Sequence, residues 1–231
     1  MSGPVRPVDA AGLILLRGHP DSPEILLGRR HAKAGFLPDI YVVPGGRVDP
    51  EDHLPSGFRE KLPPLVVEAL NTGSGRRPAI AFLRAALREL HEETGLIIGK
   101  RSSGQGAAAP VWQAYTEARI APEFGTFDFL LRAITPVGSR RRYNTRFFLG
   151  DGGDAIGDLG GDGELLDLRW RKLSELDQLN IVDVTWALIR LAVGRWRDRA
   201  EIGREPPKLL TYRNNLLVLR NMRERRAARR A

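Results

Sequence analysis

The sequence predicts a mixed α/β domain, and three observations support that class. Short apolar runs bounded by turn-forming residues are typical of buried strands, and they occur at 11–17, 24–30 and 41–43. A longer segment from Pro78 to Gly95 repeats apolar side chains at helical spacing. No apolar run approaches the roughly 18 residues that a membrane span needs. The 231 residues suffice for one domain with a sizeable core.

The first three strands and their turns begin the predicted sheet. Ala11–Arg17 and Glu24–Arg30 are separated by the turn His19–Pro23, which predicts an antiparallel hairpin. The third strand, 41–43, enters a turn formed by Pro44, Gly45 and Gly46. Glycines at this turn allow the backbone to approach a neighbouring group closely.

The end of the predicted helix carries three carboxylates. Gly95 follows the last turn, where glycine usually terminates a helix. Side chains three and four positions apart share a helix face, so Glu89, Glu92 and Glu93 gather on one side. Their mutual repulsion favours a bound divalent cation with oxygen ligands, such as Mg²⁺. A solvated Glu-rich helix face is the alternative interpretation.

The second half of the chain continues the alternation of helices and strands. A glycine- and aspartate-rich stretch, 151–163, is interpreted as a mobile acidic loop that ends at Glu164. The segment 126–137 is apolar and fits either a helix or a strand. The remaining predicted elements are a short helix at 64–70, a helix at 110–120, strands at 143–149 and 165–170, and a terminal helix at 182–193.

The net charge of +8 is located in one part of the chain. Residues 195–231 contain eleven Arg and one Lys against four acidic residues, so the rest of the sequence is neutral. Such a segment can contact RNA, anionic substrates or acidic lipid surfaces, and a solvated helix face is the alternative. The chain has no cysteine and its first residues do not resemble a secretory signal, so we expect a cytoplasmic protein with no membrane partner.

Two segments together resemble the signature of the Nudix hydrolases, G-x5-E-x7-R-E-U-x-E-E-x-G-U, where U is apolar. Gly46 matches the opening glycine, and Arg88–Leu96 matches the second half at every fixed position. There are two departures. Asp52 occupies the place of the first Glu, and residues 53–87 separate it from Arg88 where the family usually has seven residues. An insertion at about 53–78 is similar to the branch that includes peroxisomal coenzyme A diphosphatases and their bacterial relatives, in which the extra segment lies near the substrate cleft.

The resemblance implies an α/β/α sandwich with a mixed sheet over residues 1–200, followed by a basic C-terminal tail at 201–231. It also implies a bound Mg²⁺, with Mn²⁺ as the alternative, whose ligands would be Glu89, Glu92, Glu93 and the backbone carbonyl of Gly46. Arg88 would orient the glutamates, and either Glu92 or Glu164 would accept a proton from the attacking water.

The implied reaction is hydrolysis of the diphosphate bond in a nucleoside diphosphate linked to another group, with coenzyme A or an acyl-CoA among the candidates. Arg29 and Arg30 at the end of the second strand would bind a phosphate, and a solvated strand end is the alternative. Arg146 precedes Phe147 and Phe148 in a segment that resembles an element of the same branch, and it is a third candidate for substrate binding. We expect both Phe side chains to pack in the core.

Two further functions stay open at this point. One is an RNA-processing, decapping-like Nudix enzyme, and the other is a catalytically silent module that binds nucleotides or RNA. Both would use the basic tail, which is the only route by which we expect nucleic acid as a partner. Many Nudix enzymes are dimers, so the resemblance also includes a homodimer among the expected assemblies.

Overall fold

The computed structural model describes residues 5–71, 78–198, 205–214 and 216–222. The helices are α1 (Pro64–Asn71), α2 (Ile80–Thr94), α3 (Pro110–Glu117) and α4 (Asp183–Arg197). The large sheet consists of β1 (Val8–Arg17), β2 (Glu24–Arg30), β3 (Tyr41–Val42), β4 (Gly45–Arg47), β8 (Asp128–Ile134), β9 (Tyr143–Asp151), β11 (Leu165–Lys172), β12 (Lys208–Arg213) and β13 (Leu216–Asn221). Two small sheets pair β5 (Ile97–Ile98) with β10 (Ala155–Ile156) and β6 (Lys100–Arg101) with β7 (Ile120–Ala121).

The large sheet is mixed, as predicted. Its order is β11-β2-β1-β9-β8-β12-β13, with β3 beside β2 and β4 beside β1. The predicted hairpin is confirmed, because β1 and β2 pair in antiparallel register with Leu16 opposite Ile25. β1 pairs with β9 in parallel, and β12 pairs with β8 in parallel. The ambiguous segment 126–137 forms the strand β8, which lies inside the sheet.

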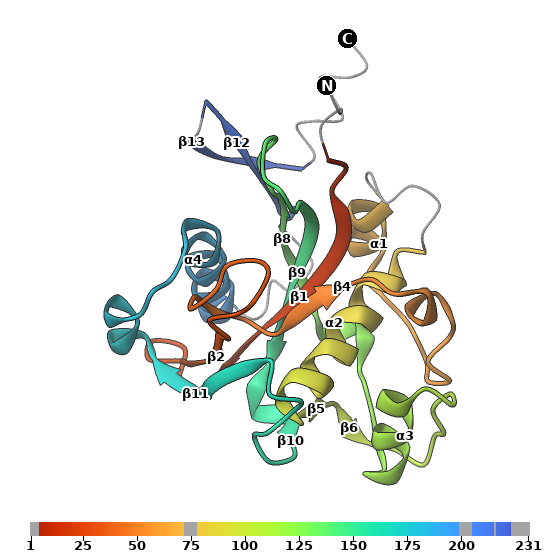
Figure 1. The fold of residues 1–231 in the computed structure, drawn as a ribbon. Helices are drawn as coiled ribbons and strands as arrows, with labels where there is room; N and C mark the ends of the chain where they lie inside the picture. Colours follow the sequence, from red (N-terminus) through yellow and green to blue (C-terminus); the bar gives the residue numbers. More distant parts are fainter. Residues whose placement is uncertain (1–4, 72–77, 199–204, 215, 223–231) are drawn as a thin grey trace.

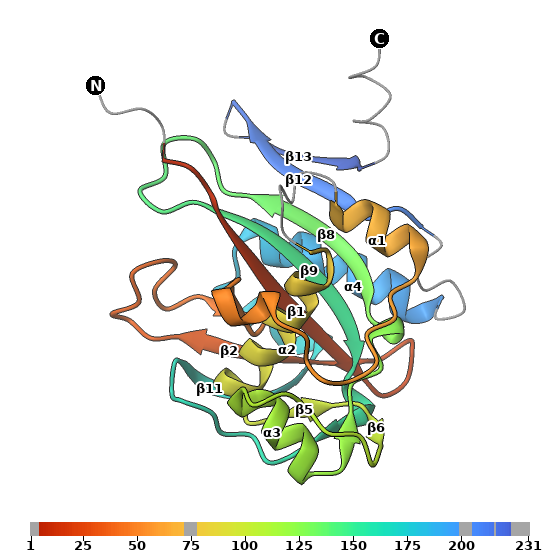
Figure 2. The same ribbon diagram turned by 90° about the vertical axis from the view of Figure 1, so that its right-hand side faces the viewer.

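Helices cover both faces of this sheet, which confirms the α/β/α sandwich. In Figures 1 and 2, α2 lies on one face together with α1 and α3, and α4 lies on the other. The alternation of side chains along β1 explains both contacts. Leu13 and Leu15 belong to the apolar cluster on the α2 side, whereas Ile14 and Leu16 belong to the cluster on the α4 side.

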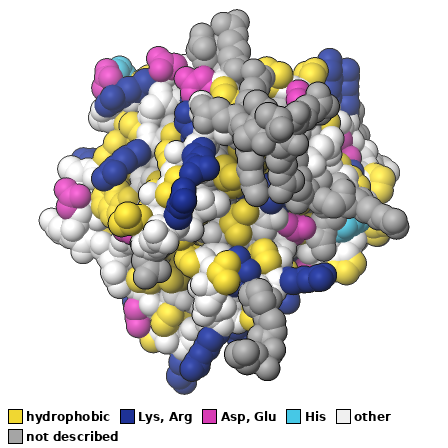
Figure 3. Space-filling model, turned by 90° about the horizontal axis from the view of Figure 1, so that it is seen from above, with side chains coloured by type: hydrophobic (Ala, Val, Ile, Leu, Met, Phe, Trp, Pro, Cys, Tyr) yellow, Lys and Arg dark blue, Asp and Glu magenta, His cyan; other side chains and the backbone are white. Residues whose placement is uncertain are grey.

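The C-terminal segment differs from the predicted basic tail. In the described residues, β12 and β13 form an antiparallel hairpin that extends the large sheet past β8. Leu209 and Leu210 are buried, and burial of these two leucines explains why the segment packs on the domain although it is rich in arginine. The expected solvated helix face is therefore wrong for residues 208–221. Seen from above in Figure 3, the Lys and Arg side chains of the described residues are scattered among apolar and neutral surface.

No helix among the described residues is long and apolar enough to cross a membrane.

Candidate metal and substrate site

The C-terminal half of α2 is held at both its apolar face and its end. Leu83, Leu87 and Leu90 are fully buried against the sheet. Gly95 adopts a left-handed conformation with φ 74° and terminates the helix as predicted. The loop after β10 then covers this end, since the amides of Gly160 and Asp162 donate 2.9 Å hydrogen bonds to the Thr94 and Glu92 carbonyls. The expected mobile acidic loop is thus bonded to α2.

The two most buried carboxylates of α2 meet Gly45 and Gly46, which begin the strand β4 directly after a bend at Pro44, where the sequence predicted a turn. The Gly45 amide donates a 2.8 Å hydrogen bond to Oε2 of Glu93, whose residue is 3% exposed. Glu89 lies against the next residue. A Cβ on Gly46 would be 2.2 Å from Oε1 of Glu89, so a larger residue there would force that carboxylate to move. The helix therefore turns both glutamates inward, toward the turn.

Burial changes the proton affinity of both groups. It raises the pKa of Glu93 to about 8, although the Gly45 hydrogen bond acts in the opposite direction. Burial likewise raises the pKa of Glu89 to about 7, against the lowering effect of the Arg88 charge. Two carboxyl groups whose ionised forms are destabilised by burial fit a site that a hard cation would complete.

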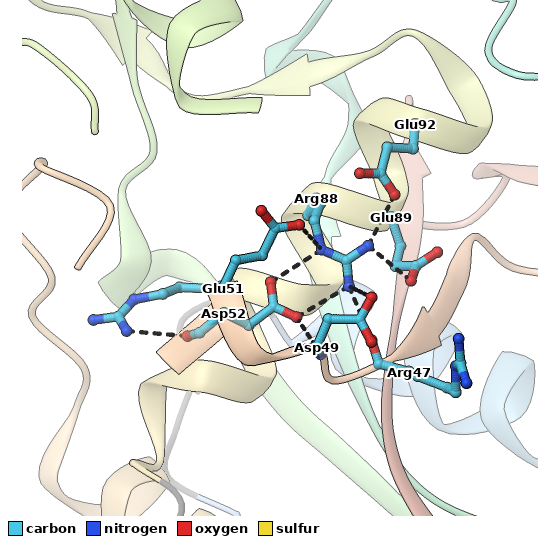
Figure 4. A network of polar contacts seen from close by, with 8 residues as sticks. Arg47, Asp49, Glu51, Asp52, Arg88, Glu89 and Glu92 are labelled. Carbon is cyan, nitrogen blue, oxygen red and sulfur yellow. Dashed lines mark hydrogen bonds and ion pairs between the residues drawn. The ribbon is translucent and has the colours of Figure 1, made fainter. Parts of the chain in front are cut away.

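Arg88 links the carboxylates into one network (Figure 4). Its Nη1 donates to Oε1 of Glu89 at 3.0 Å and to Oε2 of Glu92 at 2.8 Å. Its Nη2 donates to the carbonyl of Arg47 at 2.9 Å, which ties α2 to β4. Burial alone would lower the pKa of Arg88, but the bond to Asp52 and the surrounding carboxylates raise it above its usual range, so the guanidinium stays charged.

Asp52 completes this network despite its distance from Arg88 in the sequence. It lies in a short 3-10 helix (Pro50–His53), where its Oδ2 accepts the Asp49 amide at 2.8 Å. Both carboxylate oxygens accept from Arg88 at 3.0 Å, one from Nε and one from Nη2. Asp52 is 4% exposed, so this is a buried bidentate ion pair. The residue at the position of the family's first Glu therefore reaches α2 even though 35 residues separate it from Arg88.

A cavity of about 810 Å³ opens in front of the carboxylates. Glu89, Glu92 and Glu93 line one part of it, together with Arg30 and Glu164. Another part is apolar and aromatic, with Phe36 and Tyr143 in an edge-to-face pair 5.0 Å apart. Other residues in that part include Leu37, Val184, Phe147, Leu210 and Tyr212.

The three arginines expected to bind substrate have different positions. Arg30 lines the cavity, and its buried Nε has no hydrogen-bond partner among the described residues. Arg29 does not line it and instead donates to Asp39 at 2.6 Å. Arg146 is fully buried, with its guanidinium 3.6 Å from the Phe82 ring centroid and 3.2 Å from Oδ1 of Asp9. Arg146 therefore occupies a packing position in place of the expected substrate contact.

The described part of the insertion packs in the core beside the site. None of its described residues, 53–71 and 78, lines the cavity. Phe58 instead packs on Trp112 and Tyr115 of α3, and Val66 and Leu70 of α1 join the apolar cluster on the α2 side. The predicted helix at 64–70 is confirmed as α1, and its buried side chains pack in the core and do not line the cavity.

Sequence reasoning missed several cavity residues. Asp162 lies in the loop that was interpreted as mobile, and Phe36 lies in the loop before β3. Tyr212 lies in β12, within the segment that the sequence predicted to be a basic tail. Of the predicted core pair, Phe148 is fully buried, whereas Phe147 is half-buried and lines the cavity. The alternation of inward and outward side chains along β9 was the available signal for this difference.

The donor set fits a divalent cation in chemistry, although its atoms are not closely gathered. Carboxylate and carbonyl oxygens are the ligands that Mg²⁺ prefers. Glu89, Glu93 and the Gly46 backbone supply such oxygens around one turn. Within the described residues, no three Asp, Glu or His side chains already form a metal cage. Glu92, with its side chain 45% exposed, contacts Arg88 through Oε2, which leaves Oε1 available for an ion.

No protein-family model matches this chain, and no curated protein does. Among solved structures, a Nudix hydrolase from Alicyclobacillus acidocaldarius is similar, with a TM-score of 0.61 and 24% identity over 85% of this chain and 95% of that chain. This similarity shows that the chain has the Nudix fold. A weaker similarity, with a TM-score of 0.47 and 13% identity, covers 83% of this chain and 89% of the Nudix domain of Shewanella oneidensis NrtR, solved with ADP ribose. A MutT protein from Bacillus halodurans has a TM-score of 0.49 and 12% identity over 91% of this chain and 96% of that chain.

Proposed function

We propose that this protein is a Mg²⁺-dependent hydrolase of the diphosphate bond in a nucleoside diphosphate derivative. The observation that carries the proposal is the pair of carboxylates formed by the buried Glu93 and the largely buried Glu89, directed at Gly45 and Gly46 of β4 inside a cavity that also contains Arg30. Buried carboxylates without a cation would be costly to ionise. A cation and an anionic substrate would neutralise both the carboxylates and the arginine.

Each residue of the site would have a separate role in the proposed reaction. Glu89, Glu93, Glu92 and the Gly46 carbonyl would hold Mg²⁺, with Mn²⁺ as the alternative ion. When bound there, the ion supplies positive charge to the phosphate oxygens and lowers the pKa of a water molecule. Arg88 keeps Glu89 and Glu92 in place through its charge-assisted hydrogen bonds. Arg30, which lines the cavity and whose buried Nε has no partner among the described residues, would bind a phosphate oxygen.

Glu164 is our preferred group for accepting the proton from the attacking water. It is exposed and lines the cavity, close enough to Glu93 for its charge to raise the pKa of that residue. Glu92 is the second candidate, and Oε2 of its carboxylate accepts a hydrogen bond from Arg88. A general base must lie within hydrogen-bond reach of the proton that it accepts. The variant Glu164→Gln should therefore lower kcat while it leaves the affinity for Mg²⁺ unchanged.

The dimensions of the cavity favour a substrate larger than a bare diphosphate. Ligand pockets usually occupy about 300–1,000 Å³. The volume of about 810 Å³ leaves space beyond the carboxylates for the organic parts of a nucleotide derivative. Phe36, Tyr143 and Tyr212 offer aromatic surface for a planar group. Coenzyme A and its acyl esters remain candidates, although the described part of the insertion that suggested them does not line the cavity.

A panel assay tests the proposal. Purified protein with Mg²⁺ is incubated with ADP-ribose, NADH, nucleotide sugars, dinucleoside polyphosphates, coenzyme A, acyl-CoA and capped RNA, and phosphate is measured after treatment with a phosphatase. We expect hydrolysis of at least one small diphosphate, and loss of that activity in Glu93→Gln. The control is Glu24→Gln, which alters an exposed pair with Arg17 at the far end of β2 from Arg30. No hydrolysis of any compound, or equal activity in the Glu93 variant, would contradict the proposal.

The RNA-processing enzyme and the silent binding module receive no specific support from the described residues. Hydrolysis confined to capped RNA would favour the former, and nucleotide binding without turnover would favour the latter. We expect the protein to act on a small molecule in the cytoplasm, and gel filtration would test whether it forms the homodimer that is common among Nudix enzymes.

A further inference from the structure

We propose that Glu60, in the insertion, is a positioning residue for the carboxylate site and acts through Arg84 and Asp52. This inference rests on the proposed function of that site. The insertion would then act without contacting substrate. It separates Asp52 from α2 in the sequence, and its residue Glu60 helps to hold Asp52 against α2 in the structure.

The first contact in this chain is an ion pair between the insertion and α2. Nε of Arg84 donates to Oε1 of Glu60 at 2.7 Å, and Nη2 of Arg84 contacts Oε2 of Glu60. The side chains are 5% and 14% exposed, respectively. The Ser56 amide donates a further 3.0 Å hydrogen bond to Oε1 of Glu60. Bidentate geometry and burial distinguish this pair from an exposed surface salt bridge, which contributes little.

The second contact joins Arg84 to Asp52. Nη1 of Arg84 donates to the backbone carbonyl of Asp52 at 3.1 Å. Arg88, one turn further along α2, binds the carboxylate of the same residue. Two arginines on one face of α2 therefore hold Asp52 at its backbone and at its side chain. The carboxylate of Glu60 holds Arg84, and the carboxylate of Asp52 holds Arg88.

The position of Asp52 in turn affects the glutamates of the site. Arg88 shares its guanidinium between Asp52 and the pair Glu89 and Glu92. A shift of Asp52 would change the direction of the Arg88 fork and with it the orientation of both glutamates. Residues 53–79 separate Asp52 from the start of α2, so local chain geometry alone does not hold it there. The Glu60–Arg84 pair closes the first part of that long connection, which reduces the number of conformations open to residues 53–59.

The test uses the full-length protein with three single substitutions. Glu60→Gln removes the charge but keeps the shape and the acceptor for the Ser56 amide. Glu60→Asp keeps the charge with a shorter reach. Glu24→Gln is the matched control, because Glu24 also pairs with an arginine, Arg17, through a 2.8 Å hydrogen bond from Nε. Thermal melting establishes that each variant is folded before the comparison.

Three measurements are compared: the affinity for Mg²⁺ by calorimetry, kcat and KM on the substrate that the panel identifies, and amide hydrogen exchange of residues 49–54. Residues that orient metal ligands typically change metal affinity by about 10- to 100-fold when replaced. Because Glu60 acts through two other residues, we expect Glu60→Gln to weaken Mg²⁺ binding by about 10-fold and to lower kcat with little change in KM. Exchange at 49–54 should accelerate, Glu60→Asp should recover part of each effect, and Glu24→Gln should change none.

Unchanged Mg²⁺ affinity and unchanged exchange at 49–54 in Glu60→Gln would overturn the inference, as would an equal effect of Glu24→Gln. Failure of the proposed function gives a different result. In that case the wild-type protein binds no Mg²⁺ and hydrolyses nothing. The exchange measurement still decides whether Glu60 holds the segment that carries Asp52, since it depends on neither metal nor substrate.

Discussion

Replacing Glu93 with glutamine should make the metal-free protein more stable while it removes the proposed activity. Glu93 is 3% exposed, and burial raises its pKa from the ordinary value of 4.5 to about 8. Glutamine keeps the shape and an oxygen that can accept the Gly45 amide. It carries no charge at any pH, so it avoids the cost of ionisation in a buried position.

The sign of the pH dependence follows from proton binding. Between pH 4.5 and 8 the unfolded chain has an ionised Glu93, whereas the folded protein retains the proton. The folded state binds more protons, so its stability falls as the pH rises through this range. A tenfold change in proton affinity corresponds to about 1.4 kcal/mol. Relaxation around the ionised group reduces this cost. We therefore expect the free energy of unfolding of Glu93→Gln to exceed that of the wild type by about 1–3 kcal/mol at pH 8, and by much less at pH 5.

Urea unfolding in EDTA, from pH 5 to 8.5, measures this difference, and hydrolysis in Mg²⁺ measures activity. Added Mg²⁺ should stabilise the wild type, because the ion binds the folded state, and should have little effect on the variant. A variant that is less stable than the wild type at pH 8 without metal would refute the reasoning about burial. A variant with near-normal hydrolysis would refute the assignment of Glu93 as a metal ligand.

Four further predictions concern other parts of the site. Asp52→Ala leaves the buried Arg88 without its bidentate partner and should lower the free energy of unfolding by about 3–5 kcal/mol in urea titrations; a loss of less than 1 kcal/mol would argue against that pair. Gly46→Ala places a Cβ 2.2 Å from Oε1 of Glu89 and should weaken Mg²⁺ binding in calorimetry. Tyr212→Ala should raise KM and leave kcat nearly unchanged, since the side chain lines the cavity but is none of the groups proposed to bind the ion or accept the proton; a selective loss of kcat would contradict this role. EDTA should abolish hydrolysis, and Mg²⁺ or Mn²⁺ should restore it better than Ca²⁺, which prefers more ligands at longer distances.

The carboxylate face was predictable because its signals are local. The helical spacing of Glu89 and Glu93 and the terminating Gly95 are properties of one continuous segment. The turn at Gly45 and Gly46 lies outside that segment, and its approach to α2 was expected from the family resemblance alone. The structure brings these groups together, whereas their roles toward a metal ion stay predictions.

The position of Arg146 depends on contacts that sequence spacing does not reveal. Its partner Asp9 lies 137 residues earlier in the sequence, and the two side chains meet because β1 and β9 pair in parallel. Phe82 of α2 supplies the ring beneath the guanidinium. An arginine beside aromatic residues has the same local sequence whether it binds a substrate or packs in a core, so the tertiary contacts decide.

The C-terminal hairpin had a sequence signal that the high arginine content obscured. Two apolar runs, 209–210 and 216–219, flank a pair of asparagines, which is a hairpin pattern. Asn214 has a φ of 50°, a conformation that asparagine tolerates better than most residues. The packing of the insertion was hard to predict for a different reason. The expectation for it came by analogy, whereas its packing depends on Phe58 and the apolar face of α1.

The hairpin of β12 and β13 has a practical consequence for experiments on the C-terminus. A chain shortened at residue 213 would be an obvious test of whether the arginine-rich end binds RNA. This truncation also removes β13 and exposes the edge of β12, the strand that contains the cavity residue Tyr212. A drop in turnover after such a cut would reflect damage to the wall of the cavity even if nucleic acid played no part. Deletions meant to test the charge alone should start after Met222, and purification tags are better attached at the other terminus.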